Sequence, residues 1–208
     1  AVVLTGLVLG MSLTVSANVT STWSAGGNGQ WGNGTNWSGG AAPDNNGNDY
    51  DVQIDGGDSL NDVTVSIGDA AGSPGSFTIS NLTVDSGDDL FIRDFSVLTI
   101  DTDTGGTVTV NGTLRLEHSG GGGEQGKLAR SGTGTLTLTG NGTYYGTKDK
   151  GEIAFGSNPA LNVLDTNATM AAGFRCSGAF TNLGRVSSDN APGSGSFIAV
   201  GASVTNRG

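Results

Sequence analysis

VTVSI, at residues 63–67, is one of a series of alternating segments that decide the fold, together with NLTV (81–84), VLTID (97–101), VTVNGTLRLE (108–117) and TLTLTG (135–140). Within each segment apolar residues alternate with polar ones, and side chains two residues apart lie on one face of a β-strand. Glycine, asparagine and aspartate separate the segments, as is typical of turns. The pattern predicts an all-β protein built from many short strands.

The apolar pairs recur at similar intervals along the chain, at Val63/Val65, Leu82/Val84, Leu98/Ile100, Leu114/Leu116 and Leu136/Leu138. A repeat of about 20 residues with one inward stripe per repeat is typical of a solenoid. We therefore expect a parallel β-solenoid in which these pairs stack on one another. The alternative is an antiparallel β-sandwich or jelly roll, because Asn-Gly turns also suit hairpins.

Composition and charge narrow the functional class. Glycine accounts for 38 of the 208 residues, only 13% of residues are charged, and no long run of helix-forming residues occurs. The net charge is −10, and residues 1–92 contain ten aspartates but no lysine, arginine, glutamate or histidine. This charge repels nucleic-acid phosphates, so we expect no nucleic-acid partner. We interpret it as a solubility surface, with end-to-end alignment of subunits as the alternative.

The single cysteine, Cys176, excludes an internal disulfide framework. Its context, AGFRCSGAF, predicts a small buried residue. A bridge between two molecules in an oxidising compartment is the alternative.

Residues 1–17 allow two interpretations. The stretch is apolar and uncharged, and Val15 and Ala17 fit the positions before a signal-peptidase cut, so the first interpretation is a signal-peptide remnant. The stretch is short and interrupted by glycines, so we expect no membrane span in the mature protein. The second interpretation is a donor strand, because odd positions from 7 to 19 are apolar and most even positions are polar. Such a strand would add to a neighbouring subunit through Leu7, Leu9, Met11, Leu13 and Val15.

All three tryptophans, Trp23, Trp31 and Trp37, fall within fifteen residues, in TWSAGGNGQWGNGTNWSGGAAPDNNGNDYDVQID. We expect them to cap the open end of the first repeat, where apolar side chains would otherwise meet water. The alternative is a platform on which carbohydrate stacks. The predicted organisation is therefore residues 1–17 as signal remnant or donor strand, 18–50 as capping segment and 51–208 as solenoid repeats.

The tryptophan-rich segment resembles the N-terminal region of autotransporter-associated and related bacterial surface β-helix proteins. The resemblance covers residues 23–55 and continues loosely through the LTV, LTI and NGTL repeats. It implies a right-handed parallel β-helix that is exported and surface-associated. It implies little about activity.

Few residues are arranged for chemistry. Asp101 and Asp103 resemble a fragment of a calcium loop, but the later ligands are missing, so we interpret them as turn residues. The same interpretation holds for Asp85, Asp88 and Asp89. The only histidine, His118, has no partner for a metal site or a catalytic triad. The pairs that a polysaccharide lyase of this fold could use are Arg93 with Asp94 and Arg115 with Glu117; outward charge pairs on adjacent strands explain them equally well.

Seven N-glycosylation sequons begin at Asn18, Asn33, Asn36, Asn81, Asn111, Asn141 and Asn167. Three of them read Asn-Gly-Thr, which is also strong turn chemistry. Turn formation therefore explains them without glycans, and glycosylation in a host that performs it is the alternative.

Taken together, the patterns predict a non-enzymatic extracellular or cell-surface protein with a structural or adhesive role. It is expected to self-associate into fibres, with surface glycans as a second kind of partner, and to use no cofactor and no metal. The alternatives are a polysaccharide lyase or hydrolase on the same fold and a fragment of a larger adhesin.

Overall fold

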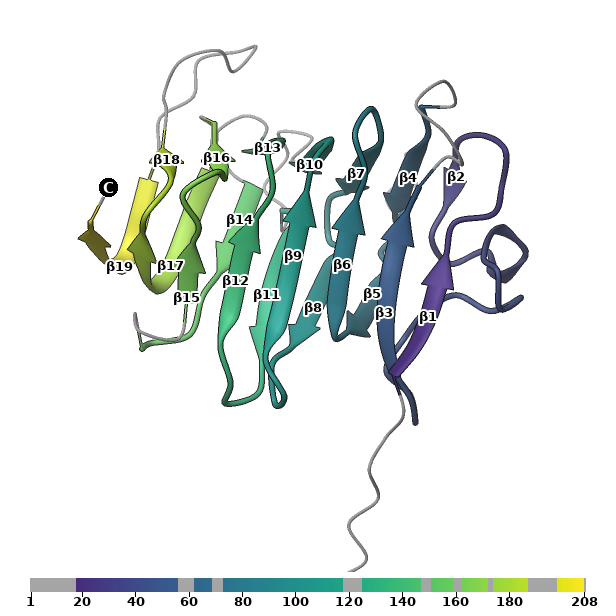
Figure 1. Ribbon diagram of the computed structural model, residues 1–208, viewed down its shortest axis with the longest axis horizontal. Helices are drawn as coiled ribbons and strands as arrows, with labels where there is room; N and C mark the ends of the chain where they lie inside the picture. The colour runs from purple at the N-terminus through teal and green to yellow at the C-terminus, as the bar shows by residue number, and fades with distance from the viewer. Residues whose placement is uncertain are drawn as a thin grey trace, which may run out of the picture.

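The computed structural model describes residues 18–55, 62–68, 73–117, 125–146, 151–158, 162–171, 174–186 and 198–207. The described residues form short strands joined by turns, with one 3-10 helix, η1 (Gly34–Asn36). Almost all strand pairs are parallel, and they stack as a β-solenoid (Figure 1). The predicted all-β parallel solenoid is confirmed, and the antiparallel sandwich or jelly roll is wrong.

The strands form three faces that run along the solenoid axis (Figure 1). Face A contains β1 (Asn18–Thr22), β3 (Asp49–Ile54), β6 (Asn81–Val84), β9 (Gly106–Val110), β12 (Leu136–Thr139) and β15 (Asn162–Leu164). Face B contains β5 (Ser76–Ile79), β8 (Val97–Asp101), β11 (Lys127–Ser131) and β14 (Gly151–Ala154). Face C contains β2 (Gly29–Gln30), β4 (Thr64–Ile67), β7 (Asp89–Ile92), β10 (Thr113–Leu116), β13 (Thr143–Gly146), β16 (Thr169–Met170) and β18 (Arg185–Val186).

The chain visits the faces in the order A, C, B, so β3 to β14 make four successive coils of three strands each. The longer strands β17 (Phe174–Asn182) and β19 (Ile198–Asn206) run from face B into face A. Gly178, at φ +87°, lies at the bulge in β17 where its pairing with β19 changes register. A Cβ there would clash with the Phe155 carbonyl, so this turn of the strand requires glycine.

The register corrects the predicted repeat. Equivalent inward positions on face A are occupied, coil after coil, by Val52, Leu82, Val108, Leu138 and Leu164. Side-chain hydrogen bonds between neighbouring coils of this face span 30, 26, 30 and 26 positions of sequence in turn, which are the lengths of the coils. The expected solenoid repeat of about 20 residues is shorter than any of these coils. Successive apolar pairs in the sequence therefore lie on different faces of the solenoid. The prediction that they stack on one another is wrong.

Inward side chains stack along each face and form one continuous core. On face C the column consists of Val65, Leu90, Leu114, Tyr144 and Met170, all fully buried. Burial of each large apolar side chain contributes roughly 1.5–3 kcal/mol. Burial also raises the pKa of the Tyr144 hydroxyl.

Arg130 occupies an inward position that departs from the apolar pattern. Ile79 and Ile100 are followed in the same column by Arg130, and Ile100 pairs directly with Arg130. The guanidinium donates to Asn162 Oδ1 at 2.8 Å and to the carbonyl of Gly134 at 2.5 Å. These bonds satisfy a charge that would otherwise be costly at the edge of the core.

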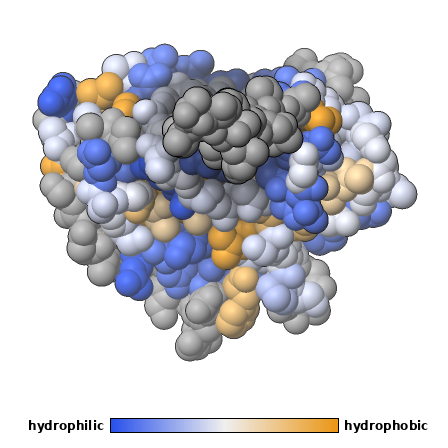
Figure 2. Space-filling view, turned by 90° about the horizontal axis from the view of Figure 1, so that it is seen from below, coloured by the Kyte–Doolittle hydropathy of each residue, from blue (hydrophilic) through white to orange (hydrophobic). Residues whose placement is uncertain are grey.

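The turns between faces B and A form the lower side of the molecule in Figure 1. Seen from that side, the described surface is mainly hydrophilic, with small separate hydrophobic patches (Figure 2). Among the described residues, no helix is long and apolar enough to cross a membrane.

Candidate functional site

Outward threonines gather on face A in a regular grid. Thr83 of β6, Thr109 of β9 and Thr139 of β12 form one ladder, and Thr107 and Thr137 form the ladder beside it. We call these five residues the threonine array; all five side chains are partly exposed. Adjacent strands lie about 4.8 Å apart and residues two apart about 6.6 Å. The array therefore repeats hydroxyl and methyl groups in two directions.

Most of the array's hydroxyl groups are available to a partner. Those of Thr83, Thr107, Thr109 and Thr137 make no side-chain hydrogen bond to any residue that the structure describes. Thr139 differs, because its Oγ1 donates to Asp165 Oδ2 at 2.9 Å. The hydroxyl groups at the centre of the array are thus unoccupied by neighbouring side chains of the described residues, and the one at Thr139 is bound by a carboxylate.

Two carboxylates border the array on face A. Asp165 accepts hydrogen bonds from the backbone of Thr166 and from the hydroxyl of Thr139, and these hold the pKa of Asp165 below its ordinary value. On the other side, Asp51 accepts from Asn18 Nδ2 at 2.9 Å and from Asn81 Nδ2 at 2.7 Å. Both carboxylates are therefore engaged by neighbours in the ladders.

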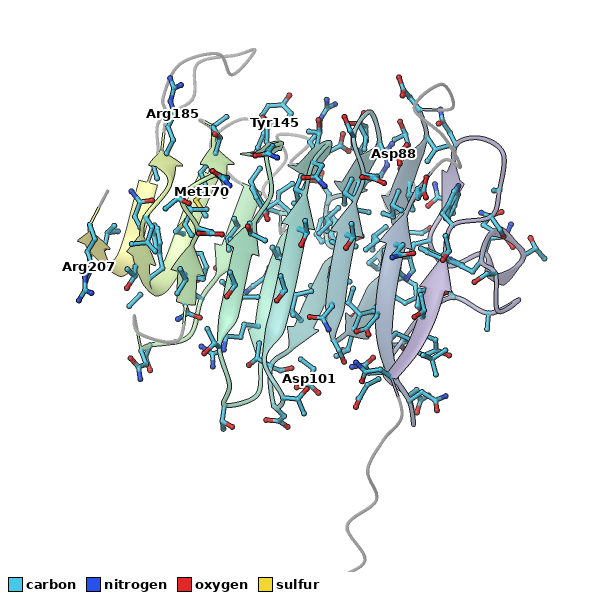
Figure 3. All side chains as sticks on the ribbon, in the orientation of Figure 1. Asp88, Asp101, Tyr145, Met170, Arg185 and Arg207 are labelled. Atoms are coloured by element: carbon cyan, nitrogen blue, oxygen red, sulfur yellow. The ribbon has the colours of Figure 1, made fainter. Side chains whose placement is uncertain are left out.

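Face C carries a stack of two aromatic rings and a guanidinium between them. Phe91, Arg115 and Tyr145 occupy consecutive positions of one outward ladder. The Arg115 guanidinium carbon lies 4.2 Å from the centroid of the Phe91 ring and 4.9 Å from that of Tyr145. We call these three residues the cation–aromatic column; Tyr145 marks its place on the upper side of the molecule (Figure 3). Because the guanidinium covers the facing ring surfaces, they cannot stack on a sugar.

The charged residues that a lyase could use form other pairs than the sequence predicted. Arg93 Nη1 lies 2.9 Å from Glu117 Oε2, on the next coil, and the Arg93 guanidinium is 5.7 Å from the Phe91 ring. Arg115 is placed between rings rather than paired with Glu117. The structure thus joins one residue from each predicted pair in an ion pair across coils. His118 lies outside the described residues.

Face B carries a second polar cluster, around Glu152. Its carboxylate accepts from Ser177 Oγ at 2.6 Å and Gln125 Nε2 at 2.8 Å, and lies 3.6 Å from Lys127 Nζ. Burial alone would raise the pKa of Glu152, but these hydrogen bonds and positive charges hold it below its ordinary value. A carboxylate that stays ionised in this way suits an ion pair rather than a general acid.

The aspartates that resemble a fragment of a calcium loop form hydrogen bonds within and between turns. Asp101 Oδ1 accepts from the Asp103 backbone at 3.1 Å, and Asp103 Oδ1 accepts from the Thr133 backbone at 3.1 Å. Asp88 is buried and accepts from the Val63 backbone at 3.0 Å. Among the described residues, no group of three or more acidic, histidine or cysteine side chains is placed to hold a metal ion.

The three tryptophans pack together at the β1 end of the solenoid. Their exposed fractions are 3%, 0% and 2% for Trp23, Trp31 and Trp37. Trp37 lies edge-on to both others, with centroids 5.0 Å and 4.8 Å apart, and Trp31 reaches Phe77 of the first coil at 5.9 Å. Buried rings offer no face to a sugar, so the carbohydrate platform is wrong, and the capping role stays a prediction.

The sequon asparagines mainly serve local structure. Side-chain hydrogen bonds to described residues are made by Asn18, Asn33, Asn36, Asn81 and Asn111. Asn141 and Asn167 are exposed, and their side chains make no hydrogen bond to a residue that the structure describes. Cys176 is buried, as predicted, and burial raises the pKa of its thiol to about 12.

Phe95 is unusual in both backbone and exposure. It lies in the turn between β7 and β8, with φ 62°, and is the only non-glycine residue with positive φ among the described residues. The residue is 47% exposed. This conformation costs roughly 1–2 kcal/mol for a residue with a Cβ, and such strain tends to persist at functional positions.

The sequence located some of these features and missed others. It identified Trp23, Trp31 and Trp37, Arg93, Arg115 and Glu117, but not the threonine array or Phe95. The donor-strand residues Leu7, Leu9, Met11, Leu13 and Val15 lie outside the described residues. Comparisons with protein-family models, curated proteins and solved structures found no match.

Proposed function

We propose that this chain is a non-enzymatic extracellular β-solenoid with a structural or adhesive role at the cell surface or in an extracellular matrix, and that it self-associates into fibres. The observation that carries the proposal is the position of β1. This strand is the edge of the twelve-stranded sheet, and its only strand neighbour among the described residues is β3. Edge strands offer backbone groups to another chain.

The chain that follows β1 covers only part of this edge and leaves the rest open to a partner. The Ser38 backbone donates to the carbonyl of Thr22, and Ser38 Oγ accepts from the Thr22 backbone at 3.1 Å. These contacts cover the last residue of β1 only. The alternating apolar segment at positions 7–19 runs directly into this strand. We therefore propose that the segment adds to the sheet edge of another copy and joins subunits into a fibre.

The charged groups support the non-enzymatic part of the proposal. Arg93 is paired with Glu117, and Arg115 is held between two rings. Groups held in this way stabilise one another along the coils and are poorly placed to transfer a proton to a substrate.

Fibre formation by the full chain is tested by electron microscopy and light scattering. Wild type should form fibres, and Leu9→Asp or Leu13→Asp should abolish or shorten them, because a carboxylate is costly in an apolar interface. Leu9→Ile, which keeps the apolar alternation, is the matched control and should form fibres normally. A wild type that stays monomeric under all conditions would refute self-association and favour a fragment of a larger adhesin.

The enzyme alternative is tested with pectin-like and alginate-like substrates. We expect no turnover above that of a heat-inactivated sample. Turnover that is lost in Arg115→Ala or Glu117→Ala would refute the non-enzymatic proposal and support a polysaccharide lyase.

Phe95 is the residue we propose for adhesive contact, because an exposed ring on a strained backbone adds nothing evident to the fold. The test measures adsorption to cellulose, chitin and alginate beads, as stand-ins for surface glycans. Phe95→Gly should weaken adsorption while leaving or raising thermal stability, since glycine relieves the strain. Unchanged adsorption to every bead would remove Phe95 from the proposed contact.

A further inference from the structure

The threonine array has the geometry of a lattice rather than that of a pocket. Its members are fixed in register by the parallel pairing of β6, β9 and β12. Spacings of about 4.8 Å along the axis and about 6.6 Å along each strand are set by the backbone, not by flexible side chains. Threonine is also stiff at χ1, which keeps the grid ordered before any partner arrives.

The array is chemically uniform. The outward positions of the three strands are Asn81, Thr83, Thr107, Thr109, Thr137 and Thr139, and none of these side chains carries a charge. In a chain with net charge −10, this uncharged area complements a neutral partner and not an ion. Each threonine supplies a hydroxyl that can donate and accept and a methyl group that water can surround.

The shape and chemistry exclude several partners. A protein interface would be expected to contain aromatic or arginine anchors, and none stands among these outward positions. A glycan would be expected to use an exposed ring, which this patch also lacks. What remains is a rigid, neutral surface that repeats in two directions and is made of hydrogen-bonding groups.

We propose that the threonine array binds ice. The prism faces of hexagonal ice present rows of water oxygens, and the shorter repeat of these rows is close to the spacing between the strands of the array. The four hydroxyls without a side-chain partner among the described residues would bond to those rows, and the methyl groups would order water between them. Pre-ordering by the strands lowers the entropic cost of holding this water. The activity is separate from fibre formation, because it uses the outward side chains of β6, β9 and β12 and not the backbone edge of β1.

The test follows full-length protein during slow growth of polycrystalline ice and measures the fraction included, together with inhibition of ice recrystallisation. Wild type should enter the ice and keep crystals small, while serum albumin at equal concentration should be excluded. Thr109→Lys, at the centre of the array, should lower inclusion by at least about tenfold. Thermal melting and circular dichroism establish that each variant is folded.

Thr143→Lys is the control, because Thr143 is a partly exposed threonine on face C and lies outside the array. It should leave ice inclusion unchanged. Exclusion of folded wild type from ice would overturn the proposal, as would equal losses in both lysine variants. Adsorption to cellulose without inclusion in ice would also overturn it and would assign face A to a glycan, whatever the fibre assay shows.

Discussion

Two outward surfaces of one solenoid use their side chains in opposite ways. In the threonine array on face A, hydroxyl groups of four residues face outward without a side-chain partner among the described residues. In the cation–aromatic column on face C, Arg115 contacts rings on both sides. The same parallel register produces both arrangements. Threonines that find no acceptor on the next coil therefore stay available to a partner, whereas the long side chains of the column contact one another.

From this contrast we expect the cation–aromatic column to contribute to stability and the threonine array to contribute to binding. The column's contacts are internal to the protein, so its removal should destabilise the fold. The array contributes few contacts to its own coil, so its removal should change binding instead. Both surfaces cover the same hydrophobic core. A substitution in that core should therefore lower stability by a similar amount beneath either surface.

The largest effect is expected beneath both surfaces. Leu138 lies under the array and Leu114 under the column, and both are fully buried. Leu138→Ala and Leu114→Ala should each lower the free energy of unfolding by about 2–5 kcal/mol, because each leaves a cavity in the same core. Urea denaturation measures both values. If the decrease in the free energy of unfolding lies outside this range in only one variant, the core is packed less well under one surface than under the other.

The next largest effect should distinguish the two surfaces by how much a substitution in each lowers stability. Arg115→Ala should lower the free energy of unfolding by about 1–2 kcal/mol, because two cation–π contacts are lost. Thr109→Ala should change it by less than about 0.5 kcal/mol, as expected of a surface position. Thermal melting of the two variants side by side measures the contrast. Equal losses would contradict the division between a stabilising column and a free array.

A smaller effect is expected at the ion pair beside the column. Arg93 and Glu117 side chains are 26% and 25% exposed, so solvent weakens their attraction. A double-mutant cycle with alanine at both positions should give a coupling of about 0.5–1 kcal/mol, which falls as salt is added. A coupling that does not respond to salt would mean that packing, rather than charge, joins the two residues.

The fold class was predictable because alternation is a local property of each strand. The coil length was not, because every face carries apolar pairs and the sequence does not say which face a pair belongs to. Leu128 and Arg130 show the difficulty: Arg130 occupies an inward position where the two preceding coils have isoleucine, which hides β11 from a search for apolar pairs.

The threonine array was missed for the same physical reason. TVTV at 107–110 and LTLT at 136–139 show the alternating threonines, but the two segments become neighbours only once the length of the coil between them is known. The ion pair between Arg93 and Glu117 likewise depends on the register of adjacent coils. Local pairs in the sequence suggested other partners, because sequence distance is a poor guide to distance across coils.

The smallest predicted effect is a change in one pKa at the edge of the array. The pKa of Asp165 is held low by the backbone of Thr166 and by the Thr139 hydroxyl. Because the folded pKa lies below the unfolded one, this contribution to stability is present above the unfolded pKa of about 3.9 and is lost as the pH falls through the folded pKa. Thr139→Val should therefore raise the pKa of Asp165 toward its ordinary value, as measured by NMR titration of the carboxyl carbon. Thr109→Val, which removes a hydroxyl that makes no bond to Asp165, is the control and should leave that titration unchanged. If both variants shift it equally, the hydroxyls of the array act together through ordered water, and the array is less separate from its bordering carboxylate than the hydrogen bonds indicate.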